Sequence, residues 1–112
     1  MSKSRTIQER NLRRIIKEMD KDIINFHCWF FPLEMREGMH HILPKSQFPE
    51  HIDNPDNLIP VGTSSHWTLT FGSARQIMNL PRINEYLRKM KSLDSQYFER
   101  YCLNKSIDSS KI

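Results

Sequence analysis

The chain has 112 residues and a net charge of +4 at pH 7, with 38% hydrophobic and 27% charged residues. This length suits a single domain, 1–112, and no stretch approaches the ~20 consecutive apolar residues of a membrane-spanning helix. The first ten residues, MSKSRTIQER, lack the apolar stretch of a secretory signal. We therefore expect a cytoplasmic protein without a membrane partner, and composition says nothing about its oligomeric state.

The charges are unevenly distributed along the chain. Residues 1–21 carry seven basic and three acidic side chains, and residues 75–112 carry eight and four. The central residues 22–74 carry only two basic and six acidic side chains. Basic terminal segments around an acidic, histidine-containing centre are typical of a protein that binds a polyanion through its ends and a cation at its centre. Solvated helix faces would give the same flanks, so charge alone leaves both interpretations open.

The basic N-terminal segment, 1–24, is predicted to form an amphipathic helix. From Thr6 to Ile24 apolar residues recur at spacings of three to five, which is typical of a helix with one buried face. Its outer face would carry Arg10, Arg13, Arg14 and Lys17, which are candidates for binding the nucleic-acid backbone. The aromatic segment 26–33, FHCWFFPL, is too short for an independent helix and is predicted to be a core-filling strand or loop.

Two short strands are predicted in the centre of the chain. They are GMHHILP (38–44) and NLIPV (57–61), and a polar loop rich in Pro, Asn and Asp (45–57) joins them. A helix carrying His66 should follow, with Thr63 or Ser64 as its N-cap and Gly72 as the point where it breaks or bends.

The C-terminal part, 81–104, is predicted to hold two helices, the second capped by Asp94. The polar tail from Asn104 onward is expected to be frayed. The order of elements predicts an α+β fold. Cys28 and Cys102 are expected to be reduced and partly buried, and without a C-x-x-C pair a structural zinc ribbon is excluded.

Four of the five histidines, His40, His41, His51 and His66, lie between positions 40 and 66. His40 and His41 are adjacent, so on a strand they point to opposite faces, and a shared site would require the backbone to bend or twist. Asn57 follows sixteen positions after His41, at the start of the second strand, and His66 lies nine positions further on.

The string MHHILPKSQFPEHIDNPDNLIPVGTSSHW, about 30 residues, resembles the motif of HNH (ββα-metal) nucleases. The resemblance implies a ββα-metal core at 37–79, flanked by the N- and C-terminal helices. It also implies that His41 is the general base, that Asn57 holds the His41 ring or the loop, and that His40 and His66 bind a divalent metal ion. The expected activity is hydrolysis of phosphodiester bonds in duplex or branched DNA.

This chain departs from the family pattern in two ways. Many members have a second histidine four positions after the helix histidine, where this chain has Thr70, and many have flanking C-x-x-C pairs, which are missing here. With two protein ligands, metal binding should be weak without substrate. The ion could be Mg, Mn, Ni or Zn, because two imidazoles favour a transition metal while an open, hydrated site also admits magnesium.

Other residues have less certain roles. Lys45, Arg75 and Arg82 could contact phosphates or could be solvated surface residues. Trp67 and Phe71 are expected to pack their helix on the core rather than stack on bases, and His27 and His51 are expected to be structural. A lone HNH domain of this size resembles nucleases encoded by phages or mobile elements. The alternatives are a non-cleaving nucleic-acid-binding protein on the same scaffold and a small structural zinc protein.

Overall fold

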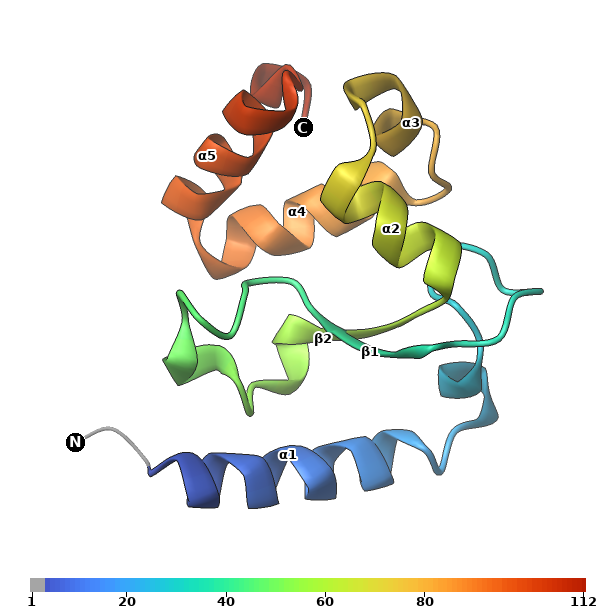
Figure 1. Ribbon diagram of the computed structural model, residues 1–112, viewed down its shortest axis with the longest axis vertical. Coiled ribbons are helices and arrows are strands. Elements are labelled where there is room, and N and C mark those ends of the chain that lie inside the picture. Colours follow the sequence, from blue (N-terminus) through green and yellow to red (C-terminus); the bar gives the residue numbers. More distant parts are fainter. Residues whose placement is uncertain (1–3) are drawn as a thin grey trace.

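The computed structural model describes residues 4–112. Within that range the chain forms five α-helices and one two-stranded antiparallel sheet (Figure 1). In chain order these are α1 (Arg5–Met19), β1 (Gly38–His41), β2 (Leu58–Val61), α2 (Thr63–Phe71), α3 (Ala74–Met78), α4 (Ile83–Leu93) and α5 (Ser95–Lys105). The mixed α and β composition agrees with the predicted α+β class.

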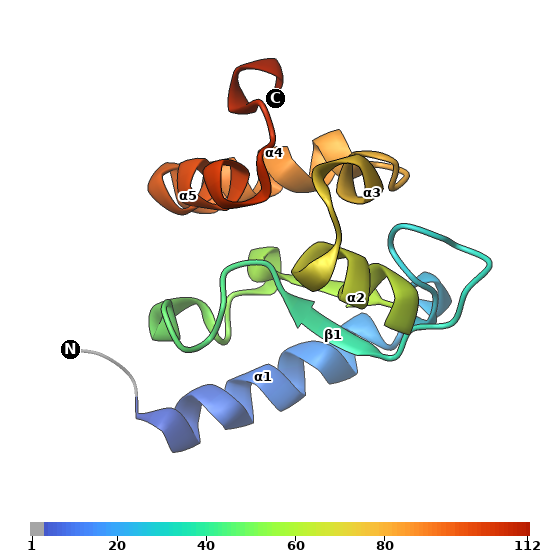
Figure 2. The same cartoon turned by 45° about the horizontal axis from the view of Figure 1, so that its top comes forward.

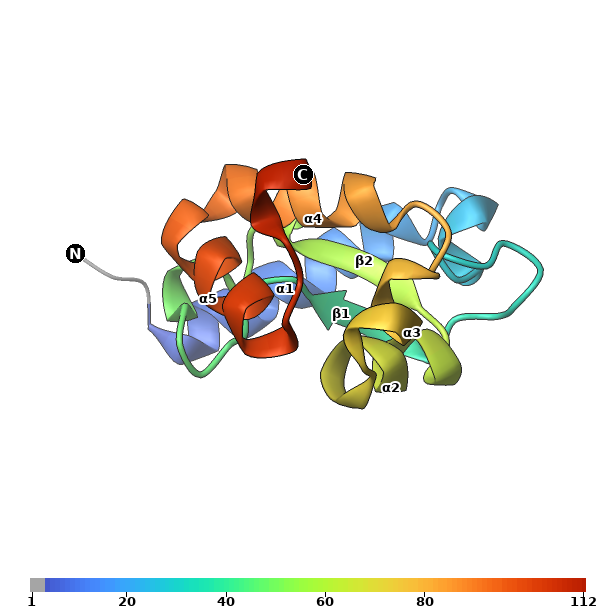
Figure 3. The same ribbon diagram turned by 90° about the horizontal axis from the view of Figure 1, so that it is seen from above.

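The small sheet lies between two helical layers. Helix α1 lies on one side of it, and α4 and α5 lie on the other (Figures 1 and 2). Seen from above in Figure 3, α1 is the distant helix behind the sheet, and α2 and α3 sit together at one end. The molecule is flattened, with extents of 38 × 36 × 20 Å. No helix in residues 4–112 is both long and apolar enough to cross a membrane.

The register of the sheet places the two adjacent histidines at the end of β1. His40 pairs with Ile59 and His41 pairs with Leu58. Backbone hydrogen bonds extend the ladder by one residue beyond each end, from Glu37 to Val61 and from Ile42 to Asn57. All of β2 is buried, whereas β1 is half-buried throughout. In the described part of the chain no other strand pairs with β1, so one of its edges is free.

The hydrophobic core lies between the sheet and the C-terminal helices. Its largest fully buried side chains include Phe30, Leu43, Tyr86, Leu87 and Phe98. No residue of α1 belongs to this core cluster. Instead, polar contacts attach α1 to the loop between the strands, because Gln8 donates to the carbonyl of Pro49 (2.6 Å) and Asn11 donates to Asp53 (2.9 Å).

The predicted N-terminal helix is shorter than expected. The segment 1–24 was predicted as one helix, whereas α1 ends at Met19, and residues 1–3 lie outside the described residues. The Asn25 side chain donates to the carbonyl of Met19, and a separate 3-10 helix, Ile23–Phe26, begins with Asp22 as its cap. A strand or a loop was predicted for 26–33, and the segment forms a loop. One isolated β-bridge, between His27 and Met35, closes this loop.

Helix α2 differs from expectation at its start and on its surface. Its N-cap is Gly62, one residue before Thr63, and Gly62 makes no side-chain cap. The helix ends at Phe71 with Gly72 as its C-cap, as predicted, and this position requires glycine because a Cβ would lie 2.5 Å from the carbonyl oxygen of Thr68. The prediction that Trp67 and Phe71 pack on the core is wrong, since the two residues are 52% and 69% exposed.

The C-terminal region is more ordered than predicted. Asp94 caps α5 as expected by accepting a hydrogen bond from the backbone N–H of Tyr97 (2.8 Å). The tail was expected to fray, but Ile107 is buried against the core and a 3-10 turn, Ser109–Lys111, follows it. Ile112 also packs against the core, and Ser109 donates to Glu99 (2.9 Å), so several contacts anchor the tail.

Candidate functional site

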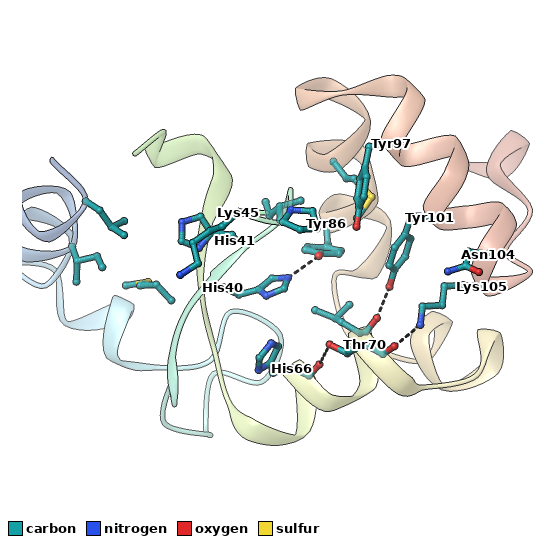
Figure 4. Close-up of a pocket in the computed structure, with 17 residues that line it drawn as sticks. His40, His41, Lys45, His66, Thr70, Tyr86, Tyr97, Tyr101, Asn104 and Lys105 are labelled. Carbon is teal, nitrogen blue, oxygen red and sulfur yellow. Dashed lines mark hydrogen bonds between the residues drawn. The ribbon is translucent and has the colours of Figure 1, made fainter. Parts of the chain in front are cut away.

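The three motif histidines line one cavity of about 620 Å³. His40 and His41 come from β1 and His66 comes from α2. Side chains of α1 close the cavity on one side of β1, and side chains of α4 and α5 close it on the other. Residues that are distant in the sequence therefore meet around a single open cavity, as the motif required. Figure 4 shows these lining residues.

Adjacent histidines can share this cavity because β1 has a free edge. His40 and His41 leave the strand on opposite sides, and His40 points toward Tyr86 (Figure 4). In a central strand such neighbours would enter separate environments. Here the cavity passes around the unpaired edge and is lined by Leu12 of α1 as well as by Tyr86 of α4. No bend within β1 is needed.

His40 and His66 form a pair of imidazoles suited to bind one metal ion. Their ring centroids are 5.3 Å apart. Two imidazoles that bind one ion at about 2.1 Å with a tetrahedral angle have ring centres about 5 Å apart. Burial lowers the pKa of His40 from 6.5 to about 4, and the neighbouring His66 and His41 add to the effect. His40 is therefore neutral at pH 7, as a ligand must be.

Each of these two histidines also has a polar side chain close to one ring nitrogen, and the sequence did not reveal either neighbour. His40 Nε2 lies 3.1 Å from the hydroxyl of Tyr86, and His66 Nδ1 lies 3.9 Å from a carboxylate oxygen of Glu37. A hydrogen-bonded group such as the Tyr86 hydroxyl can orient a metal-binding histidine and select its tautomer, whereas the Glu37 carboxylate lies beyond hydrogen-bond distance of His66. Tyr86 belongs to the same buried side of α4 as Ile83, Leu87 and Met90, but it is 46 positions away from His40.

A third protein ligand is not present next to this pair. In residues 4–112 no group of three or more His, Cys, Asp or Glu side chains is arranged to hold a metal ion. Thr70, at the position of the family's further histidine, donates its hydroxyl to the carbonyl of His66 (3.0 Å) and so serves the helix itself. Water and a substrate oxygen would have to complete the coordination of an ion at His40 and His66.

His41 is held in a definite tautomer. Its Nε2 lies 3.0 Å from the carbonyl oxygen of Ile52, which can only accept a hydrogen bond. Nε2 therefore carries the proton, and the lone pair of the neutral ring is on Nδ1. Burial lowers the pKa of His41, the charge of Lys45 lowers it further, and the bond to Ile52 raises it in part. A neutral imidazole near pH 7 can accept a proton.

Asn57 is fully buried and holds the loop that carries Ile52. Its side-chain oxygen accepts a hydrogen bond from the N–H of Leu43 (2.7 Å), and its amide donates to the carbonyls of Leu43 (3.2 Å) and His51 (3.1 Å). Asn57 thus joins the two ends of the loop between the strands. Of the two roles predicted for it, it holds the loop, and it does not contact the His41 ring.

The predicted phosphate-binding cations do not all lie at the cavity. Lys45 lines it, as does Lys105 of α5, which the sequence analysis did not single out. In α1, Leu12 and Ile16 face the cavity. At 100° per residue, Arg13 lies about 60° from Ile16 around the helix, Lys17 about 100°, Arg10 about 120° and Arg14 about 160°.

One further cation lies on the cavity side of α1, and two of the predicted cations lie away from the cavity. Arg5 falls on the same side of α1 as the two cavity-lining residues, about 20° from each in projection. Arg14 instead donates to Asn11 on the other side (3.0 Å). Arg75 is exposed on α3 and does not line the cavity.

Arg82 is occupied by structural contacts. Its guanidinium stacks on the Trp29 ring at 3.6 Å, forms two hydrogen bonds with Glu85 (2.9 and 3.0 Å) and donates to the carbonyl of Trp29. These contacts occupy guanidinium N–H donors that would otherwise bind a phosphate. The other two histidines, His27 and His51, do not line the cavity either.

We compared the chain with protein-family models, with curated proteins and with solved structures, and none of the three comparisons found a match. The site is therefore interpreted from its own geometry.

Proposed function

We propose that the chain is a metal-dependent HNH endonuclease that hydrolyses phosphodiester bonds in DNA. The observation that carries the proposal is the combination of two kinds of histidine in one cavity. His41 has a fixed tautomer and a free Nδ1 lone pair, whereas His40 and His66 face each other at 5.3 Å. In this proposal β1, β2 and α2 form the ββα-metal core.

His41 supplies the proton acceptor. A water molecule that attacks the phosphorus atom must lose a proton, and Nδ1 of His41 can take it while Nε2 remains bonded to Ile52. The hydrogen bond to Ile52 prevents the ring from turning over, and Asn57 holds the same stretch of loop by donating to the carbonyl of the preceding residue, His51. Protonated His41 then returns its proton to solvent after the bond has been cleaved.

His40 and His66 would hold one divalent ion, with Tyr86 hydrogen-bonded to His40 and the Glu37 carboxylate 3.9 Å from His66. In the tautomer that donates from Nε2 to Tyr86, His40 presents its Nδ1 lone pair. Such an ion stabilises negative charge on the phosphate and on the leaving oxygen. Lys45, which lines the same cavity, can attract a non-bridging phosphate oxygen.

DNA fits the charge around the cavity. Lys45 and Lys105 line it, and Arg5 and Arg13 are the α1 cations nearest to it around the helix. The cavity is an open one beside an edge strand, which suits a polymer that must pass through. Phosphate backbones bind to such cationic borders in a salt-dependent and largely sequence-independent way.

The proposal is tested by incubating the protein with supercoiled plasmid and labelled oligonucleotides in the presence of Mg²⁺, Mn²⁺, Ni²⁺ or Zn²⁺. We expect nicking or linearisation with at least one ion and none with a chelator. Binding without cleavage under every condition would support the alternative of a non-cleaving nucleic-acid-binding protein. A protein that unfolds when a chelator is added would support the structural zinc alternative.

A further inference from the structure

One end of the candidate cavity is formed by α5 and has a chemistry of its own. Four residues of this helix line the cavity: Tyr97, Tyr101, Asn104 and Lys105. In Figure 4 these four residues lie together, apart from His41 and Lys45. The cavity therefore has a polar and aromatic end that the proposed hydrolysis does not use.

Two of these four side chains are fixed in place by α2. The hydroxyl of Tyr101 donates to the carbonyl of Leu69 (2.9 Å), and the ammonium group of Lys105 donates to the carbonyl of Thr70. An ammonium group has three donors, so Lys105 keeps two of them for a ligand. Thr70 lies one turn after His66, about 6 Å along the helix axis, so Lys105 is held close to the proposed metal ligand of α2.

The other two side chains carry polar groups that are free to bind a ligand. In residues 4–112 neither the hydroxyl of Tyr97 nor the side-chain amide of Asn104 forms a hydrogen bond. The ring of Tyr97 lies beside that of Tyr101, with centroids 6.4 Å apart and a tilt of 34°. The α5 end thus combines an aromatic wall, an amide that can both donate and accept, and a cation held in position.

The charge of the cavity favours an anion. Among the described residues that line it none is Asp or Glu, whereas Lys45 and Lys105 both line it. Glu37 lies 3.9 Å from the histidine in the first turn of α2, whereas Lys105 contacts the last turn. Asp94 caps α5, and Glu99 accepts a hydroxyl of the C-terminal 3-10 turn (2.9 Å). A ligand that carries both a phosphate and an aromatic ring matches these surroundings.

We propose that the α5 end of the cavity is a subsite for one unpaired nucleotide of the substrate, next to the cleaved bond. Lys105 binds its phosphate, and the base lies against Tyr97 and Tyr101 with its edge at Asn104. This inference rests on the proposed function, because it assumes that the phosphate at the two metal-binding histidines belongs to DNA. A cavity of about 620 Å³ lies in the range of pockets that enclose a small ligand, about 300–1,000 Å³. A base has to leave its stack to enter such a cavity.

The test measures binding of small probes to the whole chain by titration calorimetry without metal. The probes are deoxyadenosine monophosphate, deoxyribose phosphate, which lacks the base, and inorganic phosphate. We expect the nucleotide to bind about 5- to 150-fold more tightly than deoxyribose phosphate, the range for one base on an aromatic ring. Deoxyribose phosphate measures the part of the affinity that the phosphate alone supplies.

Matched variants separate the phosphate contact from the base contact. Lys105→Gln keeps a donor for the Thr70 carbonyl but removes the charge, so it should weaken the nucleotide and deoxyribose phosphate alike, by about 10-fold or more. Tyr97→Leu, which keeps an apolar side chain against the core, and Asn104→Ala, at an exposed position, should weaken the nucleotide alone. Leu103→Ala, which removes an 82% exposed side chain of α5, should have no effect.

Three results would overturn the inference. Equal affinity for all three probes would mean that the cavity binds an anion only. Equal losses of nucleotide and deoxyribose phosphate in Asn104→Ala would mean that no base reaches α5. Unchanged nucleotide binding in both Lys105→Gln and Asn104→Ala would place the nucleotide elsewhere.

Plasmid cleavage separates a failure of this inference from a failure of the proposed function. Cleavage by a wild-type chain that gives any of these three results would show that only the subsite is wrong. Nucleotide binding with the expected losses, but no cleavage with any ion, would support the subsite and contradict the proposed activity.

Discussion

His41 and Ile52 are joined by a hydrogen bond of 3.0 Å between the imidazole Nε2 and the backbone carbonyl, across eleven positions of the sequence. This bond decides which nitrogen of His41 is free. It depends on the position of the loop between the strands, which the buried Asn57 holds through three hydrogen bonds. The proposed base and the buried amide are therefore connected through the backbone, and not through side-chain contact.

Asn57→Ala should reduce both stability and activity. The substitution leaves the N–H of Leu43 without its partner in a buried setting, which costs about 1–3 kcal/mol. It also frees the carbonyl of His51, the residue before Ile52, and so loosens the stretch of loop that orients His41. Thermal unfolding and cleavage rates would be measured together. The control is Asn54→Ala, which removes a cap from an exposed turn and should lower stability less and leave the rate nearly unchanged. A variant with normal stability and normal activity would contradict the role of Asn57.

Tyr86→Phe and Glu37→Gln should weaken metal binding without removing a ligand. Partners of this kind typically change metal affinity by about 10- to 100-fold. Titration calorimetry with Mn²⁺ or Zn²⁺ would measure the change, and Tyr97→Phe, which alters another hydroxyl lining the cavity, is the control. If Tyr86→Phe and Glu37→Gln both bind the ion as the wild type and the control do, these two groups do not support a metal ion at His40 and His66.

The salt dependence of DNA binding should reveal which cations face the substrate. Each phosphate contact contributes roughly −0.9 to the slope of log affinity against log salt concentration. Neutralising Arg5, Arg13 and Lys45 together should flatten the slope by about two to three. Lys45 lines the cavity, and Arg5 and Arg13 are the α1 cations nearest to the cavity-lining side of the helix. Neutralising Arg14, Arg88 and Lys111 should change the slope little, because none of these lines the cavity and Arg14 lies about 160° around α1 from Leu12 and Ile16. Equal slopes for both triple variants would place the DNA on another surface.

Both cysteines should resist thiol reagents in the folded protein. Cys28 and Cys102 are free, and they are 2% and 1% exposed. Burial, with a further contribution from Glu99, raises the pKa of the Cys102 thiol to about 11. At pH 8 only about one Cys102 thiol in a thousand is then a thiolate, which is the form that reacts. Reaction with an aromatic disulfide reagent should need denaturant, and rapid labelling of Cys102 without it would contradict the packing of α5.

Several parts of the structure could be predicted from the sequence because the signals are local. The strands around His40 and Asn57 are bounded by Gly38 and Pro44 or by a Pro-rich loop, and Asp94 has the side chain that α5 needs as its cap. The two free, buried cysteines were also expected. Local signals were insufficient for the start of α2, since Gly62 acts as N-cap without a side chain.

What the sequence did not reveal depends on tertiary contacts. Tyr86 reaches His40 across 46 positions, and the exposure of Trp67 depends on which side of α2 meets the core. Periodicity could not decide this for a nine-residue helix with apolar or aromatic residues on more than one side. The anchoring of Ile107 has the same cause, because two isoleucines five positions apart in a polar tail carry no periodic signal.

The central claim is that His41 accepts the proton of the attacking water, and single-turnover cleavage by His41→Ala tests it most directly. The comparison uses saturating metal, with His51→Gln as a histidine control outside the cavity. We predict that the rate falls by about 10²- to 10⁴-fold in His41→Ala, while metal affinity, DNA affinity and melting temperature stay close to wild type. Cleavage by His41→Ala at the rate of the wild-type and His51→Gln proteins would contradict the account.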